Sequence, residues 1–167
     1  MMKRFMTLLK TELKLSLRGM DMVIFALILP VVMMGILGII YGNKPAFEGA
    51  EYSFLAQSFG AVSTIAVCAG GVMGLPLVIS DYRQRKILKR FWVTPASPAL
   101  LLAVQAAVYA IYAFASLILN ATVFAVVFGG RLSGSWGLFF AAFLYVMVSM
   151  FSIGIMVGGV APNAKIA

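Results

Sequence analysis

Long uncharged apolar runs alternate with short charged stretches along the chain. Four such runs cover residues 22–41, 54–79, 99–128 and 136–160. A transmembrane helix needs about 20 apolar residues to cross a hydrocarbon core about 30 Å thick, and each run is long enough. The pattern therefore predicts an all-α integral membrane protein with four transmembrane helices in a domain spanning residues 22–167.

Residues 1–20 form a separate amphipathic unit. Wound as a helix at about 100° per residue, its basic residues fall on one arc and its Leu, Met and Phe residues on the other side. This arrangement is typical of a helix that lies in the membrane interface. The alternative is the basic start of a signal peptide, but the next apolar run exceeds the usual length of a signal-peptide core and no small-residue cleavage site follows it.

Small residues and prolines mark the spans internally. Pro30 and the pair Leu75-Pro76 predict bends, because proline cannot donate a helical hydrogen bond. Glycine or alanine recurs every fourth residue on two spans, which favours close helix packing over a ligand site. The positions are Ala66, Gly70 and Gly74 on the second span and Gly154 and Gly158 on the fourth.

The stretch 81–98 is the most highly charged part of the chain. We expect its first part, residues 81–92, to form a short surface helix that ends near Thr94-Pro95. Basic residues surround an apolar stripe of Ile87, Leu88, Phe91 and Trp92. Two interpretations stay open: the helix docks into a groove on a cytoplasmic partner, or it lies on anionic lipid.

The distribution of Lys and Arg predicts the topology. Five precede the first span and five lie between the second and third, whereas one lies in each of the other two connections and Lys165 follows the fourth. Loops rich in Lys and Arg stay in the cytoplasm. We therefore expect both termini to be cytoplasmic.

Composition agrees with a membrane protein and narrows its chemistry. Hydrophobic residues make up 63% of the chain, charged residues 11%, and the mean hydropathy is +1.05. The basic residues that give the net charge of +8 lie outside the apolar runs. We therefore expect this chain to interact with anionic lipid and not with nucleic acid. Cys68 is the only cysteine and histidine is absent, so we predict no metal site and no cofactor.

Motifs for catalysis and ion coupling are absent. The chain has no GxxxxGK[ST] loop, HExxH pair or GxSxG turn, and no paired carboxylates within a span, so we expect no enzymatic activity of its own. Polar residues within spans are few. Tyr109, Tyr112 and Asn120 could line a substrate path, but their residue types favour hydrogen bonds between helices over that role.

Residues 79–98, which read ISDYRQRKILKRFWVTPASP, resemble the intracellular loop of ABC-2 type transporter permeases. That loop has an acidic residue, an Arg-rich turn, Gly-Thr, Leu-x-Arg-Leu and then Thr-Pro-x-Ser. Asp81 replaces the usual Glu, Lys86-Ile87 replaces Gly-Thr, and residues 88–91 and 94–97 fit the later steps. The order of helix, spans and charged loop resembles the family over the whole chain.

This resemblance implies a permease subunit of an ATP-driven exporter in a prokaryotic plasma (inner) membrane. It implies two protein partners, a separate ATP-binding subunit and a second permease half, in a homo- or heterodimer. Permeases of the family have six spans, so we expect a truncated form that lacks two spans and does not transport alone. The residues implied to couple to the ATP-binding subunit are Asp81, Arg83, Arg85, Lys86, Ile87, Leu88, Arg90, Phe91, Trp92, Thr94 and Pro95.

A different class of function also fits the residues. In this alternative the chain is a small membrane scaffold or channel-like protein. Its basic helices bind anionic lipid, and its small-residue faces drive oligomerisation.

Overall fold

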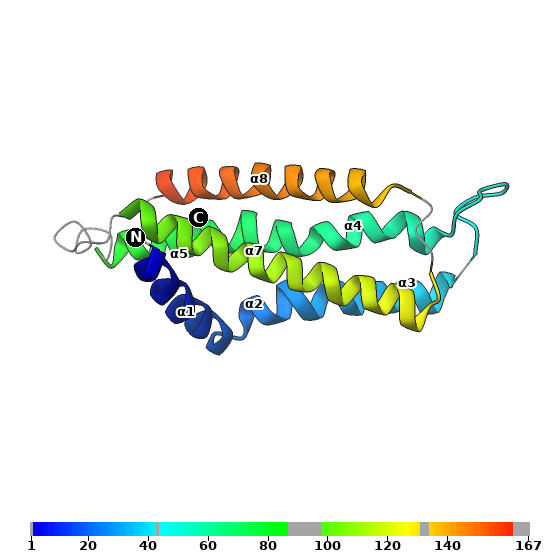
Figure 1. Cartoon of the computed structure of the whole chain (residues 1–167), viewed down its shortest axis with the longest axis horizontal. Coiled ribbons are helices and arrows are strands. Elements are labelled where there is room, and N and C mark those ends of the chain that lie inside the picture. Colours follow the sequence, from blue (N-terminus) through cyan, green and yellow to red (C-terminus); the bar gives the residue numbers. More distant parts are fainter. Residues whose placement is uncertain (1, 43, 87–97, 131–133, 162–167) are drawn as a thin grey trace.

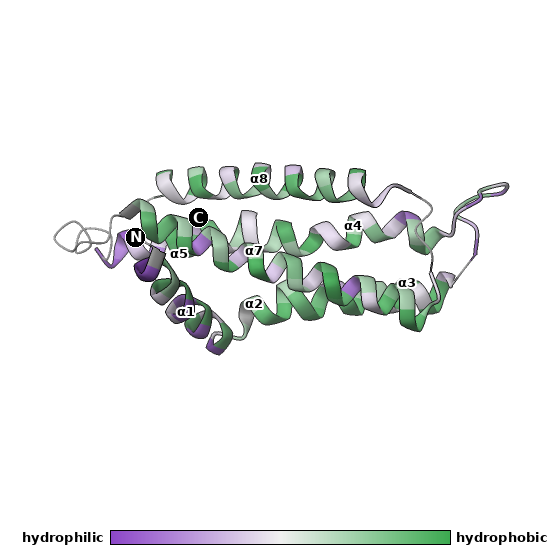
Figure 2. Cartoon of the chain, in the orientation of Figure 1, coloured by the Kyte–Doolittle hydropathy of each residue, from purple (hydrophilic) through white to green (hydrophobic). Residues whose placement is uncertain are grey.

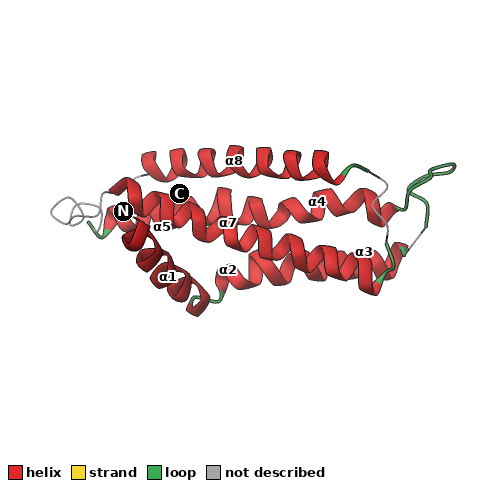
Figure 3. Ribbon diagram, viewed as in Figure 1, coloured by secondary structure: helices red, strands yellow, loops and turns green. Residues whose placement is uncertain are grey.

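The computed structural model describes residues 2–42, 44–86, 98–130 and 134–161. These residues are helical apart from short connections, and the described part of the chain contains no strand, only an isolated bridge between Pro45 and Ser53 (Figure 3). The prediction of an all-α protein is confirmed. The elements are α1 (Met2–Arg18), α2 (Asp21–Val23), η1 (Ile24–Ile28), α3 (Leu29–Tyr41), α4 (Phe54–Cys68), η2 (Ala69–Gly74), α5 (Leu75–Gln84), α7 (Pro98–Thr122), η3 (Val123–Val127) and α8 (Trp136–Val160), where η denotes a π-helical turn.

Four helical segments are long and apolar enough to cross a membrane, as the sequence predicted. They are Ile24–Tyr41, Phe54–Gln84, Ala99–Val127 and Trp136–Val160. Figure 2 shows apolar residues along these helices and a concentration of hydrophilic residues on α1. The second segment continues past the predicted end at residue 79, because α5 adds one more helical turn before it ends at Gln84.

Both prolines inside spans follow a π-helical turn. Pro30 lies directly after η1 and Leu29, and Pro76 lies directly after η2 and Leu75. A proline has no N–H and its ring crowds the carbonyl four residues earlier. The wider π-helical turn accommodates the proline, so the N–H of Leu75 donates to the carbonyl of Gly70, five residues back. The helices therefore continue through both prolines.

Local residues account for the ends of several helices. The Ser53 hydroxyl accepts a hydrogen bond from the Ala56 N–H at 3.2 Å and so caps the start of α4. Gly42 ends α3 at a positive φ of 54°, which glycine adopts without a steric cost. Met20 adopts φ 52° directly after α1, where the chain turns into the first span.

The helix α4–η2–α5 is the centre of the bundle. Of its apolar window 61% is buried, compared with 17% for α8. Figure 1 shows it between α8 on one side and α3 on the other, and α7 packs against α1, α3 and α4. Every other span therefore contacts this central helix.

Buried side chains form two cores along the bundle. The larger one contains Leu75, Ile79, Val108 and Tyr112 and receives side chains from α1. The smaller one contains Met34, Leu55, Phe59, Val62 and Phe124. Figure 1 shows α1, the C-terminal end of α5 and the C-terminal end of α8 at the same end of the bundle. The assignment of this end to the cytoplasm remains a prediction from loop charges.

Candidate functional site

The C-terminal end of α5 carries the first residues of the predicted coupling helix. Asp81 does not begin a separate surface helix, because residues 81–84 are the last turn of α5, with Arg85 as its cap and Lys86 at φ 56°. Arg85 Nε donates to Asp81 Oδ1 at 2.8 Å across this turn. The remaining predicted coupling residues lie outside the described residues: Ile87, Leu88, Arg90, Phe91, Trp92, Thr94 and Pro95.

Arg83 joins this end of α5 to the end of α8. Its Nη1 donates to the carbonyl oxygen of Ala161 at 3.2 Å and also contacts the carbonyls of Gly158 and Gly159. The last carbonyls of a helix have no partner within the helix and carry a partial negative charge, so a guanidinium group stabilises them. In the structure the Arg83 side chain caps α8, and its contact with a partner protein stays a prediction.

Tyr82 joins the same turn to two further helices. Its hydroxyl donates to Glu12 Oε2 on α1 at 2.8 Å. Gln105 on α7 donates from Nε2 to the same carboxylate oxygen at 2.8 Å and to the Tyr82 hydroxyl at 3.1 Å. These three side chains, which we call the Glu12 cluster, connect α1, α5 and α7. Gln105 is buried, and Glu12 and Tyr82 are half-buried.

Glu12 was not among the residues predicted from the sequence, although its position carried a signal. Wound at about 100° per residue, Glu12 falls among apolar residues and away from the basic arc of α1. It is also the only acidic residue on this helix. A single carboxylate on the apolar face of an amphipathic helix indicates a buried polar partner, because an unpaired charge is costly to bury.

A cavity of about 420 Å³ borders the Glu12 cluster. Its walls come from α1, the turn that follows α1, the start of the first span, α5 and α7. The lining residues are Glu12, Leu15, Ser16, Gly19, Met22, Leu77, Val78, Asp81, Tyr82, Gln105 and Tyr109. The cavity thus has a carboxylate, phenol and amide at one part of its wall and aliphatic side chains at another.

Tyr109, Tyr112 and Asn120, predicted for a substrate path, are all buried in the bundle. Tyr109 covers the glycine face of the central helix, where a Cβ at Gly70 would come within 3.3 Å of its ring and one at Gly74 within 2.6 Å. Ala66 is buried in the same core. The Asn120 amide donates to the Ser116 carbonyl of its own helix at 3.0 Å. Of the three, Tyr109 also reaches the cavity beside Glu12.

Gly154 and Gly158 lie where α8 contacts the central helix. A Cβ at Gly154 would collide with the carbonyl oxygen of Gly71. At Gly158 a Cβ would lie 2.9 Å from Ile79 Cβ and 3.0 Å from Pro76 Cα. A side chain at Gly154 would collide with the backbone and one at Gly158 would displace Ile79, so these glycines allow the close approach of the two backbones.

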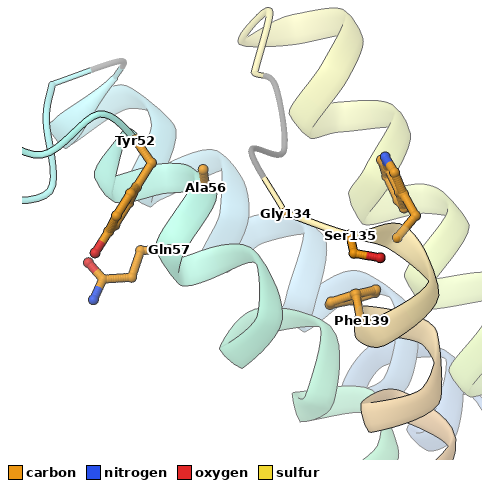
Figure 4. A pocket seen from close by; sticks show the side chains of 7 residues that line it. Tyr52, Ala56, Gln57, Gly134, Ser135 and Phe139 are labelled. Atoms are coloured by element: carbon orange, nitrogen blue, oxygen red, sulfur yellow. The ribbon is translucent and has the colours of Figure 1, made fainter.

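A second pocket of about 360 Å³ lies at the opposite end of the bundle. Figure 4 shows Tyr52 and Gln57 on one side of it and Ser135 and Phe139 on the other. None of the described residues that line it is charged, and they include Trp136. Tyr and Trp are frequent at membrane interfaces, and their positions here agree with that preference. Among the described residues no three potential metal ligands come together.

No curated protein and no solved structure matches the chain. The family model of the ABC-2 type transporter matches residues 3–167, nearly the whole sequence. The matched residues include the four spans, nearly all of the amphipathic helix α1, and the charged stretch after α5. The chain therefore belongs to the ABC-2 type transporter family, whose members form the permease component of ABC-type transporters.

Proposed function

We propose that this chain is the permease subunit of an ATP-driven exporter and that its ATP-binding subunit acts on residues 81–92. Permeases of this family are non-catalytic membrane components that generally work with an ATP-binding subunit. The proposal includes a second permease half, identical or different, and bilayer lipid as the remaining partners. A prokaryotic plasma membrane with both termini in the cytoplasm is the setting that we propose.

The observation that carries this proposal is the set of contacts made by two adjacent residues at the end of α5. Tyr82 bonds to α1 and α7 through Glu12 and Gln105, and Arg83 bonds to the end of α8. A displacement of this turn would therefore act on three other helices at once. The segment that resembles the family's coupling loop continues directly from this turn.

The scarcity of acidic side chains in the described spans also supports an ATP-driven mechanism. Transporters that use ion gradients usually place ionisable side chains inside the membrane. In the described residues of the spans, the only acidic side chain is Asp81, at the very end of the second segment, where it pairs with Arg85. The spans thus offer no chain of ionisable groups to carry a proton across the bilayer.

Affinity purification of the tagged chain from its native membrane tests the coupling. We expect the chain to recover an ATP-binding protein with a GxxxxGK[ST] motif, identified by mass spectrometry. The double substitution Arg90→Glu and Trp92→Glu should weaken the association about thirtyfold or more and lower this recovery accordingly, since interface anchors of these types contribute about 2 kcal/mol or more.

Lys44→Glu provides the matched control, because Lys44 is an exposed basic residue at the other end of the bundle. Its recovery should equal that of the unmodified chain. Equal recovery of the ATP-binding protein by the double variant would contradict the proposal.

A further inference from the structure

We propose that the cavity beside Glu12 is a binding site for amphipathic molecules that carry a primary ammonium group. The site lies between α1, the first span, α5 and α7. The inference concerns binding and does not require that the ligand be exported or that residues 81–92 contact an ATPase.

The Glu12 carboxylate has unused capacity to bind a cation. Both of its hydrogen bonds, from Tyr82 and Gln105, come from neutral donors and end on Oε2. Among the described residues Oε1 receives no hydrogen bond, and the only ion pair there is between Arg85 and Asp81. An ammonium group supplies both the positive charge and the N–H donors that this oxygen lacks.

A purely structural link does not require the charge of Glu12. The side-chain carbonyl of a glutamine would accept the same two hydrogen bonds from Tyr82 and Gln105. A half-buried carboxylate that meets only neutral donors instead carries a desolvation cost. A cationic ligand offsets this cost, and an anionic ligand would increase it because Asp81 also lines the cavity.

The rest of the cavity fits the apolar part of such a ligand. Leu15, Met22, Leu77 and Val78 form the aliphatic part of its wall. The Tyr109 ring lies beside them, and an aromatic face attracts an organic cation. The volume of about 420 Å³ falls within the range of small-molecule sites, about 300 to 1,000 Å³. The shared chemistry is thus a primary amine attached to an apolar body.

Two sources supply this chemistry, a soluble amphipathic amine and the headgroup of an aminolipid such as phosphatidylethanolamine. The probe for the first is dansylcadaverine, a fluorescent primary amine, with N-pentyl dansylamide as its neutral analogue. Binding is measured as dansyl fluorescence on the purified full chain in phosphatidylcholine nanodiscs, with empty nanodiscs subtracted. We expect saturable binding of the amine and about tenfold weaker binding of the neutral analogue, as for a hydrogen bond to a charged group.

Glu12→Gln keeps the acceptor for Tyr82 and Gln105 and removes the charge. This variant should bind dansylcadaverine about tenfold more weakly and bind the neutral analogue unchanged. Glu48→Gln is the control, because Glu48 is an exposed carboxylate in the connection between the first two spans, and it should leave both affinities unchanged. In Ser16→Phe the larger side chain extends from α1 into the cavity, so this variant should bind both probes more weakly.

Replacing part of the phosphatidylcholine with phosphatidylethanolamine distinguishes the two sources. If the aminolipid occupies the site, the apparent affinity for dansylcadaverine falls in the unmodified chain and does not fall in Glu12→Gln. If the affinity is unchanged, the site selects the soluble amine. The inference is overturned if Glu12→Gln binds dansylcadaverine as well as the unmodified chain does, or if the neutral analogue binds equally well.

Discussion

The two ends of the bundle are held together by different kinds of contact. At the end with the second pocket, Phe59 packs between Phe124 and Phe139, with ring centroids 5.3 and 5.4 Å away. At the end that carries α1, hydrogen bonds from Tyr82, Gln105 and Arg83 join the helices in addition to the apolar contacts of the larger core. Aromatic packing depends on shape, whereas hydrogen bonds fix the direction and register of each helix.

Because the contacts differ, we expect the two ends of the bundle to have different roles. Between helices in lipid, close packing replaces the hydrophobic driving force, and the rings at one end supply it. The hydrogen bonds at the other end contribute less stability but bring three other helices to one turn of α5. Stability and transmission of movement should therefore be separable by substitution.

Phe59→Ala should have the largest effect on stability. Phe59 is fully buried in the smaller core, so its removal leaves a cavity and costs about 3 kcal/mol. Unfolding in mixed micelles of dodecyl maltoside and SDS, followed by circular dichroism, measures this loss. Stimulation of the partner ATPase, measured per folded chain, should stay unchanged. A loss of stimulation equal to that of polar-end variants would break the comparison.

Arg83→Ala should have an intermediate effect on stability and a large effect on coupling. The substitution removes the cap of α8, and hydrogen bonds that involve a charged group contribute about 2 kcal/mol. Arg83→Lys should retain part of this stability, because a lysine ammonium can reach a carbonyl but lacks the planar fork of arginine. The same micelle titration measures the change in stability, and an assay of the partner ATPase measures the change in coupling. Normal ATPase stimulation in Arg83→Ala would show that the link to α8 carries no movement.

Tyr82→Phe should have the smallest effect on stability. It removes one hydroxyl that bonds to Glu12, and interhelical hydrogen bonds in membranes contribute about 0.6 kcal/mol on average. Gln105 still donates to Glu12 in this variant, so α1 should stay attached. Cysteine cross-linking between α1 and α5 measures whether they separate. A decrease of more than about 2 kcal/mol in the free energy of unfolding, measured by the same micelle titration, would indicate that the Glu12 cluster is a main support of the fold.

The sequence predicted the spans well because lipid imposes a single simple requirement. An uncharged run such as 136–160 has no other stable arrangement than a membrane helix, and α8 covers Trp136–Val160. The end of the second span was less predictable. Asp81 and Arg83 are charged, which marks the edge of the hydrocarbon region but does not end a helix, so α5 continues to Gln84.

The contacts of the candidate site could not be read from the sequence. Arg83 and the end of α8 are separated by 75 or more residues, and no local pattern indicates that they meet. Glu12 and Gln105 are 93 residues apart and belong to helices whose facing sides were unknown. Only the position of Glu12 on the apolar side of α1 gave advance indication of such a partner.

The π-helical turn η2 has a consequence for how this chain tolerates changes in length. A π-helical turn holds one residue more than the α-helical turn it replaces. Loss of one residue from Ala69–Gly74 would therefore convert this turn to an α-helical turn and leave the helix after it nearly unrotated. Loss of one residue from the α-helical part Phe54–Cys68 would instead turn everything after it by about 100° about the helix axis, since each residue of an α-helix contributes that rotation. Tyr82 and Arg83 would then face away from Glu12 and α8. A single-residue deletion deep in the membrane would thereby disconnect a junction several helical turns away, whereas a deletion within the π-helical turn would preserve it.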